Sequence, residues 1–116
     1  MAKSRVIATK GRETAISLLF LLALWAPLLS SRAQTTHTVL IEGMQFKPPS
    51  VIVKLGDSIV WKNTDLVPHT VTASDRSFDS GLIEAGATWS LHVEARGEIL
   101  YTCVIHPLMK GNIEVK

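Results

Sequence analysis

The amino-acid sequence predicts an all-β domain, a Greek-key β-sandwich or barrel of about seven to eight strands, preceded by a cleaved signal peptide. Two observations support this fold class. From residue 36 onward, short runs of alternating apolar and polar residues are separated by turn-forming residues, and no helical period extends over any length. Several short strands joined at short intervals by turns are typical of β-sandwiches and β-barrels.

The segment of residues 1–33 has the features of a secretory signal peptide. Basic residues precede an apolar run at 15–29, and Ser31 and Ala33 supply the small side chains of a cleavage site. The run is shorter than the roughly 20 residues that a helix needs to span a bilayer, and Pro27 interrupts its end. We therefore expect cleavage after Ala33, no stable membrane insertion afterwards, and a periplasmic or otherwise extracytoplasmic protein.

The remaining residues, 34–116, are expected to form one domain. They carry seven Lys and Arg against nine Asp and Glu, a net charge of about −2, although the whole chain has a formal charge of +2. This balance gives no electrostatic footprint for nucleic acid. Cys103 is the only cysteine, so an intramolecular disulfide is excluded. An exported protein with one thiol has to protect it by burial or by a metal.

The strands of the first half are expected at residues 37–42, 51–55, 58–62 and 70–73. Prolines and a serine form a turn at 47–50, and Gly56 and Asp57 form the next one. In the third run, Ile59 and Trp61 lie on one face because side chains alternate along a strand.

In the second half, Trp89, Leu91 and Val93 alternate with polar residues and predict a half-buried strand. Residues 74–86 are rich in Asp, Ser and Gly and are expected to be a loop with at most a short strand. Two further strands are expected. The residues that face inward from them are Ile99, Tyr101 and Cys103, and, after Gly111, Ile113 and Val115.

The most informative motif places three potential metal ligands on one short connection. Cys103, His106 and Met109 follow one another at intervals of three residues, and His69 comes after Pro68 at the start of another strand. Two imidazoles, one thiolate and one weak thioether are the ligands of a trigonal copper site with axial Met, which transfers electrons. Taken singly, each residue has a plainer explanation, such as core packing for Met109. Their combination is what favours one copper ion.

Three other chemistries fit the same residues less well. A structural zinc site prefers four Cys or His ligands, and a thioether suits it poorly. A Cys–His nucleophile would need an activating helix N-terminus or an oxyanion site, for which the sequence offers no candidate. A multicopper oxidase fragment would need paired copper-binding histidines, which are missing. A single copper with all ligands supplied by protein leaves no position for a substrate, so we do not expect an enzyme.

Five segments resemble the cupredoxins, in particular the amicyanin, plastocyanin and pseudoazurin group, and the resemblance as a whole extends over nearly all of residues 39–115. These segments are Phe46-Lys-Pro, Val53-Lys-Leu-Gly-Asp, Trp61-Lys-Asn, Pro68-His-Thr-Val and the stretch from Tyr101 to Gly111. The Cys-x-x-His-x-x-Met spacing is similar to that of amicyanin. The resemblance implies a Greek-key sandwich with one type 1 copper at one end, held by His69, Cys103 and His106 with Met109 as axial ligand. It also implies that Asn63 ties the His69 loop to the Cys103 loop.

The resulting hypothesis is an exported electron-transfer protein, monomeric, that exchanges electrons with a c-type cytochrome, a dehydrogenase or an oxidase. We expect the edge of the His106 ring to reach the surface within a small apolar docking patch, of the size that weak redox encounters use. The patch residues are expected to be Met44, Leu66, Pro68, Pro107 and Leu108.

An alternative function is a copper carrier that delivers the ion to an exported cuproenzyme. Such a carrier would need an exposed and exchangeable site, whereas a thiolate on a short loop favours retention. The two remaining histidines are expected to have plainer roles. His92 lies on the polar side of its strand and is expected to be solvated, and His37 is expected at most to bind metal weakly.

Overall fold

The computed structural model describes residues 26–116. The predicted signal peptide lies largely outside these residues, and its cleavage stays a prediction. Ala33–Lys116 forms one unit. Within the described part of the chain, no helix has the length and hydropathy needed to span a membrane.

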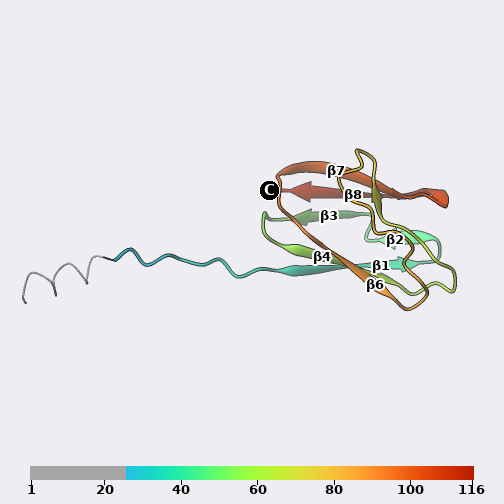
Figure 1. Ribbon diagram of the computed structural model, residues 1–116, viewed down its shortest axis with the longest axis horizontal. Coiled ribbons are helices and arrows are strands. Elements are labelled where there is room, and N and C mark those ends of the chain that lie inside the picture. The colour runs from blue at the N-terminus through green and yellow to red at the C-terminus, as the bar shows by residue number, and fades with distance from the viewer. Residues whose placement is uncertain (1–25) are drawn as a thin grey trace, which may run out of the picture. The chain divides into compact units, whose positions relative to one another are not determined.

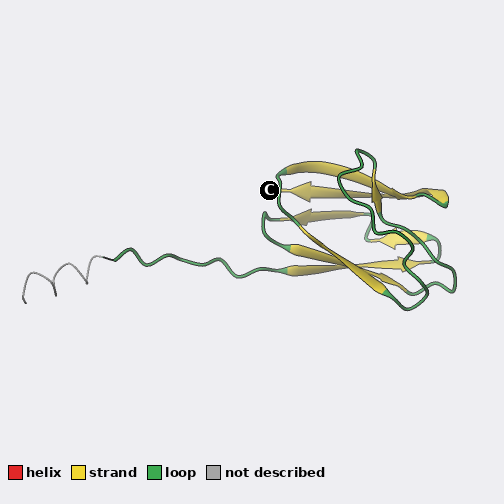
Figure 2. Cartoon of the chain, viewed as in Figure 1, coloured by secondary structure: helices red, strands yellow, loops and turns green. Residues whose placement is uncertain are grey.

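The prediction of an all-β sandwich is confirmed, since eight strands form two four-stranded sheets (Figure 1). Strands and loops account for all described residues, without a helix among them (Figure 2). The strands are β1 (Thr36–Glu42), β2 (Gln45–Lys47), β3 (Ser50–Val53), β4 (Ser58–Asn63), β5 (Thr72–Ala73), β6 (Thr88–His92), β7 (Gly97–Cys103) and β8 (His106–Val115).

One sheet has the strand order β2-β1-β4-β6 and the other β3-β8-β7-β5. The pairs β1–β4 and β3–β8 are parallel, and the remaining pairs are antiparallel. Neighbours in a sheet are therefore often distant in sequence, as in a Greek-key topology. The end of β1, the end of β4 and the β7–β8 connection come together at one end of the sandwich, and this end holds the candidate ligands.

A cluster of aromatic rings fills the core below that end. Trp61 from one sheet contacts Tyr101 from the other, with ring centroids 5.5 Å apart and an edge-on angle of 83°. The Trp61 Nε1–H also donates a hydrogen bond of 3.2 Å to the Tyr101 hydroxyl. Phe46 packs against the same tyrosine ring at 4.7 Å. Edge-to-face contacts add to the area that these rings bury, so they lock the two sheets together.

The observed strands differ in detail from the expected ones. The short strand β2 was not predicted, because three residues next to Pro48 and Pro49 carry no usable periodicity. The last strand begins at His106 and not after Gly111. Residues 74–86 are indeed a loop, with only isolated bridges from Thr72 to Asp79 and from His69 to Ile83.

The two histidines outside the predicted site have separate environments. His92 is exposed, as expected. The His37 Nε2 lies 2.9 Å from the Asp57 carboxylate, which is itself buried, and weak metal binding by His37 stays a prediction. The same carboxylate accepts hydrogen bonds from the amides of Thr35 and Lys54. His37 therefore belongs to a polar cluster that fastens the start of β1 to the turn before β4.

Tyr101 gives the first testable prediction, because it is the only tyrosine in the chain. Burial raises its pKa from an ordinary value of 10.0 to about 12, and the hydrogen bond from Trp61 opposes this only partly. In the unfolded chain the phenol ionises near pH 10, so the unfolded state releases its proton first. The contribution of Tyr101 to the free energy of unfolding is therefore retained below pH 10. It falls by on the order of 2–3 kcal/mol as the pH rises towards 12.

A spectrophotometric titration of tyrosinate absorbance, run beside circular dichroism, checks this expectation. Absorbance should rise only near pH 12 or together with loss of the fold, and the chain in denaturant should titrate near pH 10. Ionisation near pH 10 by a protein that keeps its native circular dichroism would contradict it.

Candidate metal centre

Two of the candidate ligands lie on one tight connection. Cys103 ends β7 and His106 begins β8, and the two residues are paired across the turn between these strands. A bulge at Thr102 and Cys103 shifts the register here. Bulges of this kind redirect a side chain at the end of a sheet. The local sequence thus places a sulfur and an imidazole next to each other.

His69 comes from the loop between β4 and β5. Its backbone amide and carbonyl exchange hydrogen bonds with Ile83, which holds the loop against residues 74–86. The His69 side chain is fully buried, and so is Cys103, whereas His106 is partly exposed. Two of the three candidate ligands are therefore shielded from solvent, and the site contacts solvent only through the imidazole of His106.

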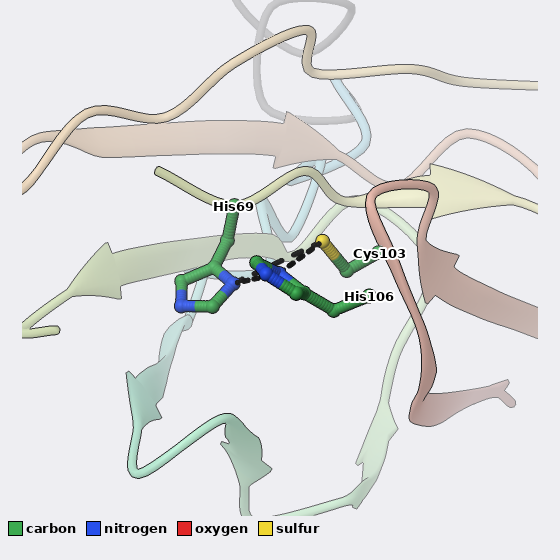
Figure 3. Close-up of side chains that lie close together, drawn as sticks. All are labelled: His69, Cys103 and His106. Carbon is green, nitrogen blue, oxygen red and sulfur yellow. Dashed lines mark hydrogen bonds between the residues drawn. The ribbon is translucent and has the colours of Figure 1, made fainter. Parts of the chain in front are cut away.

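The three side chains point toward one another (Figure 3), and their ligand atoms all lie within 4.8 Å of each other. The Nδ1 atoms of the two imidazoles are 3.1 Å apart. The Cys103 Sγ lies 3.9 Å from Nδ1 of His69 and 3.6 Å from Nδ1 of His106. An ion that binds nitrogen at about 2.0 Å and sulfur at about 2.3 Å in a trigonal plane would separate these atoms by roughly 3.5–3.7 Å. The donor set and its spacing therefore fit one metal ion.

Met109 follows His106 by three residues within β8 and is buried in the same core cluster as Cys103. Its burial allows either a packing role or that of a weak axial ligand. Its assignment as a copper ligand stays a prediction.

Thr70 connects the two ligand loops, which is the role that we expected of Asn63. The Thr70 amide donates to the Cys103 sulfur at 3.3 Å, and the Thr70 hydroxyl accepts a hydrogen bond of 2.9 Å from the amide of Val104. The contact with the sulfur could not be predicted from residue type, because a backbone amide can donate from any residue.

Asn63 instead fastens the His69 loop to residues 74–86. Its side-chain amide donates to the carbonyls of Val67 and Ile83 at 2.8 and 2.9 Å, and its oxygen accepts from the amide of Asp65. The expected link to the Cys103 loop is therefore corrected, since both hydrogen bonds of the side-chain NH2 group go to the His69 loop and to residues 74–86.

Asp65 lies next to the site and was missed in the sequence. Its carboxylate is 2.9 Å from Nε2 of His69, the ring nitrogen that faces away from the other ligands. The amides of Gly43 and Met44 donate to the same carboxylate at 2.7 and 3.0 Å. Burial raises its pKa, but these amide bonds and His69 outweigh burial and hold the pKa of Asp65 below its usual value. Its position four residues before His69 was the available signal.

The surface around His106 is apolar. His106, Met44, Pro107 and Leu108 line one shallow depression of about 500 Å³, together with the unpredicted Ile105. Leu108 is 96% exposed and Leu66 is 95% exposed. Of the predicted patch residues, Leu66 and Pro68 do not line this depression.

A family model for the copper-binding proteins of the plastocyanin/azurin family matches residues 33–116, which is the whole of the described sandwich. The chain belongs to this family. It is thus a cupredoxin, and copper is the metal that fits the His69, Cys103 and His106 cluster.

Curated relatives of this cupredoxin include amicyanins. It is 31% identical over 83 residues to amicyanin-alpha of Methylorubrum extorquens, covering 67% of this chain and 70% of that protein. It is 27% identical over 81 residues to amicyanin of Paracoccus denitrificans, covering 66% of this chain and 62% of that one. It is also 30% identical over 115 residues to the methylamine utilization protein MauL of Methylophilus methylotrophus, covering 85% of this chain and 66% of that one.

Solved structures agree with this kinship. A copper(I) form of an amicyanin variant superposes with a TM-score of 0.66 at 26% identity, covering 74% of this cupredoxin and 87% of that chain. A copper-containing nitrite reductase from Thermus scotoductus has a TM-score of 0.67, but only 24% of its chain is covered, at 24% identity. This second likeness concerns the fold alone.

Proposed function

We propose that this cupredoxin is an exported, periplasmic electron-transfer protein that passes single electrons between redox partners. The observation that carries the proposal is the convergence of His69, Cys103 and His106, whose ligand atoms lie within 4.8 Å of one another inside a rigid sandwich. Copper bound there would supply a one-electron couple between Cu(II) and Cu(I). We assign Met109 as the fourth, weak ligand.

The protein's own contribution is to hold the ligands still. His69 and Cys103 are fully buried, and each is fixed by hydrogen bonds from its surroundings. A site whose ligands keep their positions costs little reorganisation when an electron arrives. Burial also excludes water, and the Thr70 amide directed at the sulfur influences the potential.

The partly exposed ligand, His106, is the proposed route for electrons. It opens into the apolar depression lined by Met44, Pro107 and Leu108. We infer that a partner docks there briefly, as in weak redox encounters. With a net charge near −2 for residues 34–116, long-range steering would be modest. Candidate partners are a c-type cytochrome, a dehydrogenase or an oxidase.

Replacing Leu108 with Gln tests this docking surface. Leu108 is 96% exposed, so we expect little change in stability, visible spectrum or potential. Electron self-exchange of the copper protein, measured by NMR line broadening, should slow by roughly fivefold or more, because loss of an interface anchor costs more than about 1 kcal/mol.

The matched control is Ile52→Gln. Ile52 is 61% exposed on β3, which pairs with β8 at residues 112–115, beyond the ligand end. This control should exchange electrons at the parent rate. A Leu108→Gln protein that also keeps the parent rate would mean that electrons leave elsewhere. If instead neither protein exchanges electrons while both release copper readily to a chelator, the copper-carrier function holds in place of the proposed one.

A further inference from the structure

Asp65 occupies a position between the metal centre and the docking surface. Its carboxylate accepts from Nε2 of His69 on one side and from the amides of Gly43 and Met44 on the other. Its side chain is only 15% exposed. One partly buried carboxylate thus contacts a candidate copper ligand and a surface hairpin that is more than twenty residues away in sequence.

The hairpin that Asp65 holds has an unfavourable backbone. Gly43 and Met44 form the two-residue connection between β1 and β2, and both have positive φ angles, of 61° and 60°. Two such angles are typical of the tight turns that join antiparallel strands, but a side chain at the second position costs about 1 kcal/mol or more. Such a conformation persists where neighbouring groups fix it. The two hydrogen bonds to Asp65 do so here.

Met44 at the tip of that turn lines the depression beside His106. The turn therefore supplies one wall of the proposed docking surface. On the other side of Asp65, an imidazole that binds a metal through one nitrogen is oriented by the partner of its second nitrogen. The negative charge of Asp65, whose carboxylate lies 2.9 Å from Nε2 of His69, also favours Cu(II) over Cu(I) at the adjacent site.

We propose that Asp65 is a positioning residue that links the copper site to the docking surface: it orients His69, lowers the reduction potential, and holds the Gly43–Met44 turn against His106. This inference rests on the proposed function, since it takes His69 as a copper ligand. The Asp65 carboxylate would then affect both the charge environment of the copper ion and the shape of the surface through which electrons leave.

The test is Asp65→Asn. Asn has a single acceptor oxygen and cannot accept from His69, Gly43 and Met44 at once, and it carries no charge. In the apoprotein, amide hydrogen exchange at Gly43 and Met44 should accelerate by roughly tenfold or more. In the copper protein, Cu(II) affinity should fall by roughly 10- to 100-fold relative to Cu(I), with a rise in the reduction potential.

The control variant is Asp75→Asn. It removes the same charge from an exposed turn, where the Asp75 carboxylate caps the Ser77 amide. It should keep the parent affinity, potential and exchange rates at the Gly43–Met44 turn. The proposal is overturned if Asp65→Asn behaves like this control, or if only one of its two effects appears, since Asp65 would then act on the turn or on the metal alone. Should the parent protein itself fail to form a blue copper centre, the proposed function fails, while hydrogen exchange in the apoprotein still reports on the turn.

Discussion

Replacing Cys103 with Ser is expected to abolish the blue colour that the parent apoprotein should acquire with one equivalent of Cu(II). The intense visible absorption of such centres arises from the bond between Cu(II) and a thiolate. Cys103 is the only cysteine of the chain, so no other residue can supply this bond. Visible absorption spectroscopy during the titration measures the effect, and essentially all of the band should be lost.

The fold should survive the substitution. Cys103 is fully buried, so a hydroxyl in its place costs on the order of 1–2 kcal/mol, well below the stability of a typical domain. Val104→Ser, at the exposed neighbouring position, is the control and should stay blue. A parent protein that binds Cu(II) and remains pale would refute the type 1 assignment, and so would a Cys103→Ser protein as intensely coloured as the parent.

The second large effect is expected for Gly111→Ala. Gly111 lies opposite Tyr101 in the β7–β8 pair, and a methyl group at residue 111 would occupy the space of the tyrosine ring. The ring has little freedom to move, because Phe46 and Trp61 pack against it and Trp61 donates a hydrogen bond to its hydroxyl. Overpacking in a rigid core typically costs 1–3 kcal/mol, and we expect at least about 3 kcal/mol here.

A double-mutant cycle with Tyr101→Leu isolates this clash. In the Tyr101→Leu background the added methyl meets a smaller and more flexible side chain, so Gly111→Ala should cost little. Guanidinium denaturation of the four proteins gives the coupling free energy, which should exceed about 2 kcal/mol. Equal costs of Gly111→Ala in both backgrounds would mean that the ring is not what excludes the methyl group.

The fold class and the ligand cluster could be predicted from the sequence because both depend on spacing along the chain. Alternation placed Ile59, Trp61 and Tyr101 in the core, and the recurring interval of three residues brought Cys103 and His106 together. The expected loop after Ala73 was also confirmed. These features are local or repeat with a fixed period, which is what a sequence records directly.

The contacts that support the site could not be predicted in the same way. Thr70 reaches the Cys103 sulfur through its backbone amide, a contact that leaves no trace in residue type. Asp65 acts through the amides of Gly43 and Met44, and this depends on how β1 lies beside β4. The role expected of Asn63 was wrong in its partner for a similar reason, since its hydrogen bonds follow the course of a loop that has no periodicity.

The position of β3 in its sheet has a consequence for the order of folding. Its one neighbour there is β8, so Ser50–Val53 has no strand to pair with until residues 112–115 exist. A polypeptide that ended before His106 would lack all of β8, so it would have neither a partner for β3 nor the proposed ligands His106 and Met109. Contacts so distant in sequence form late and slowly. Closure of the sandwich and assembly of the proposed ligand cluster should therefore occur together, late in folding, because both require β8.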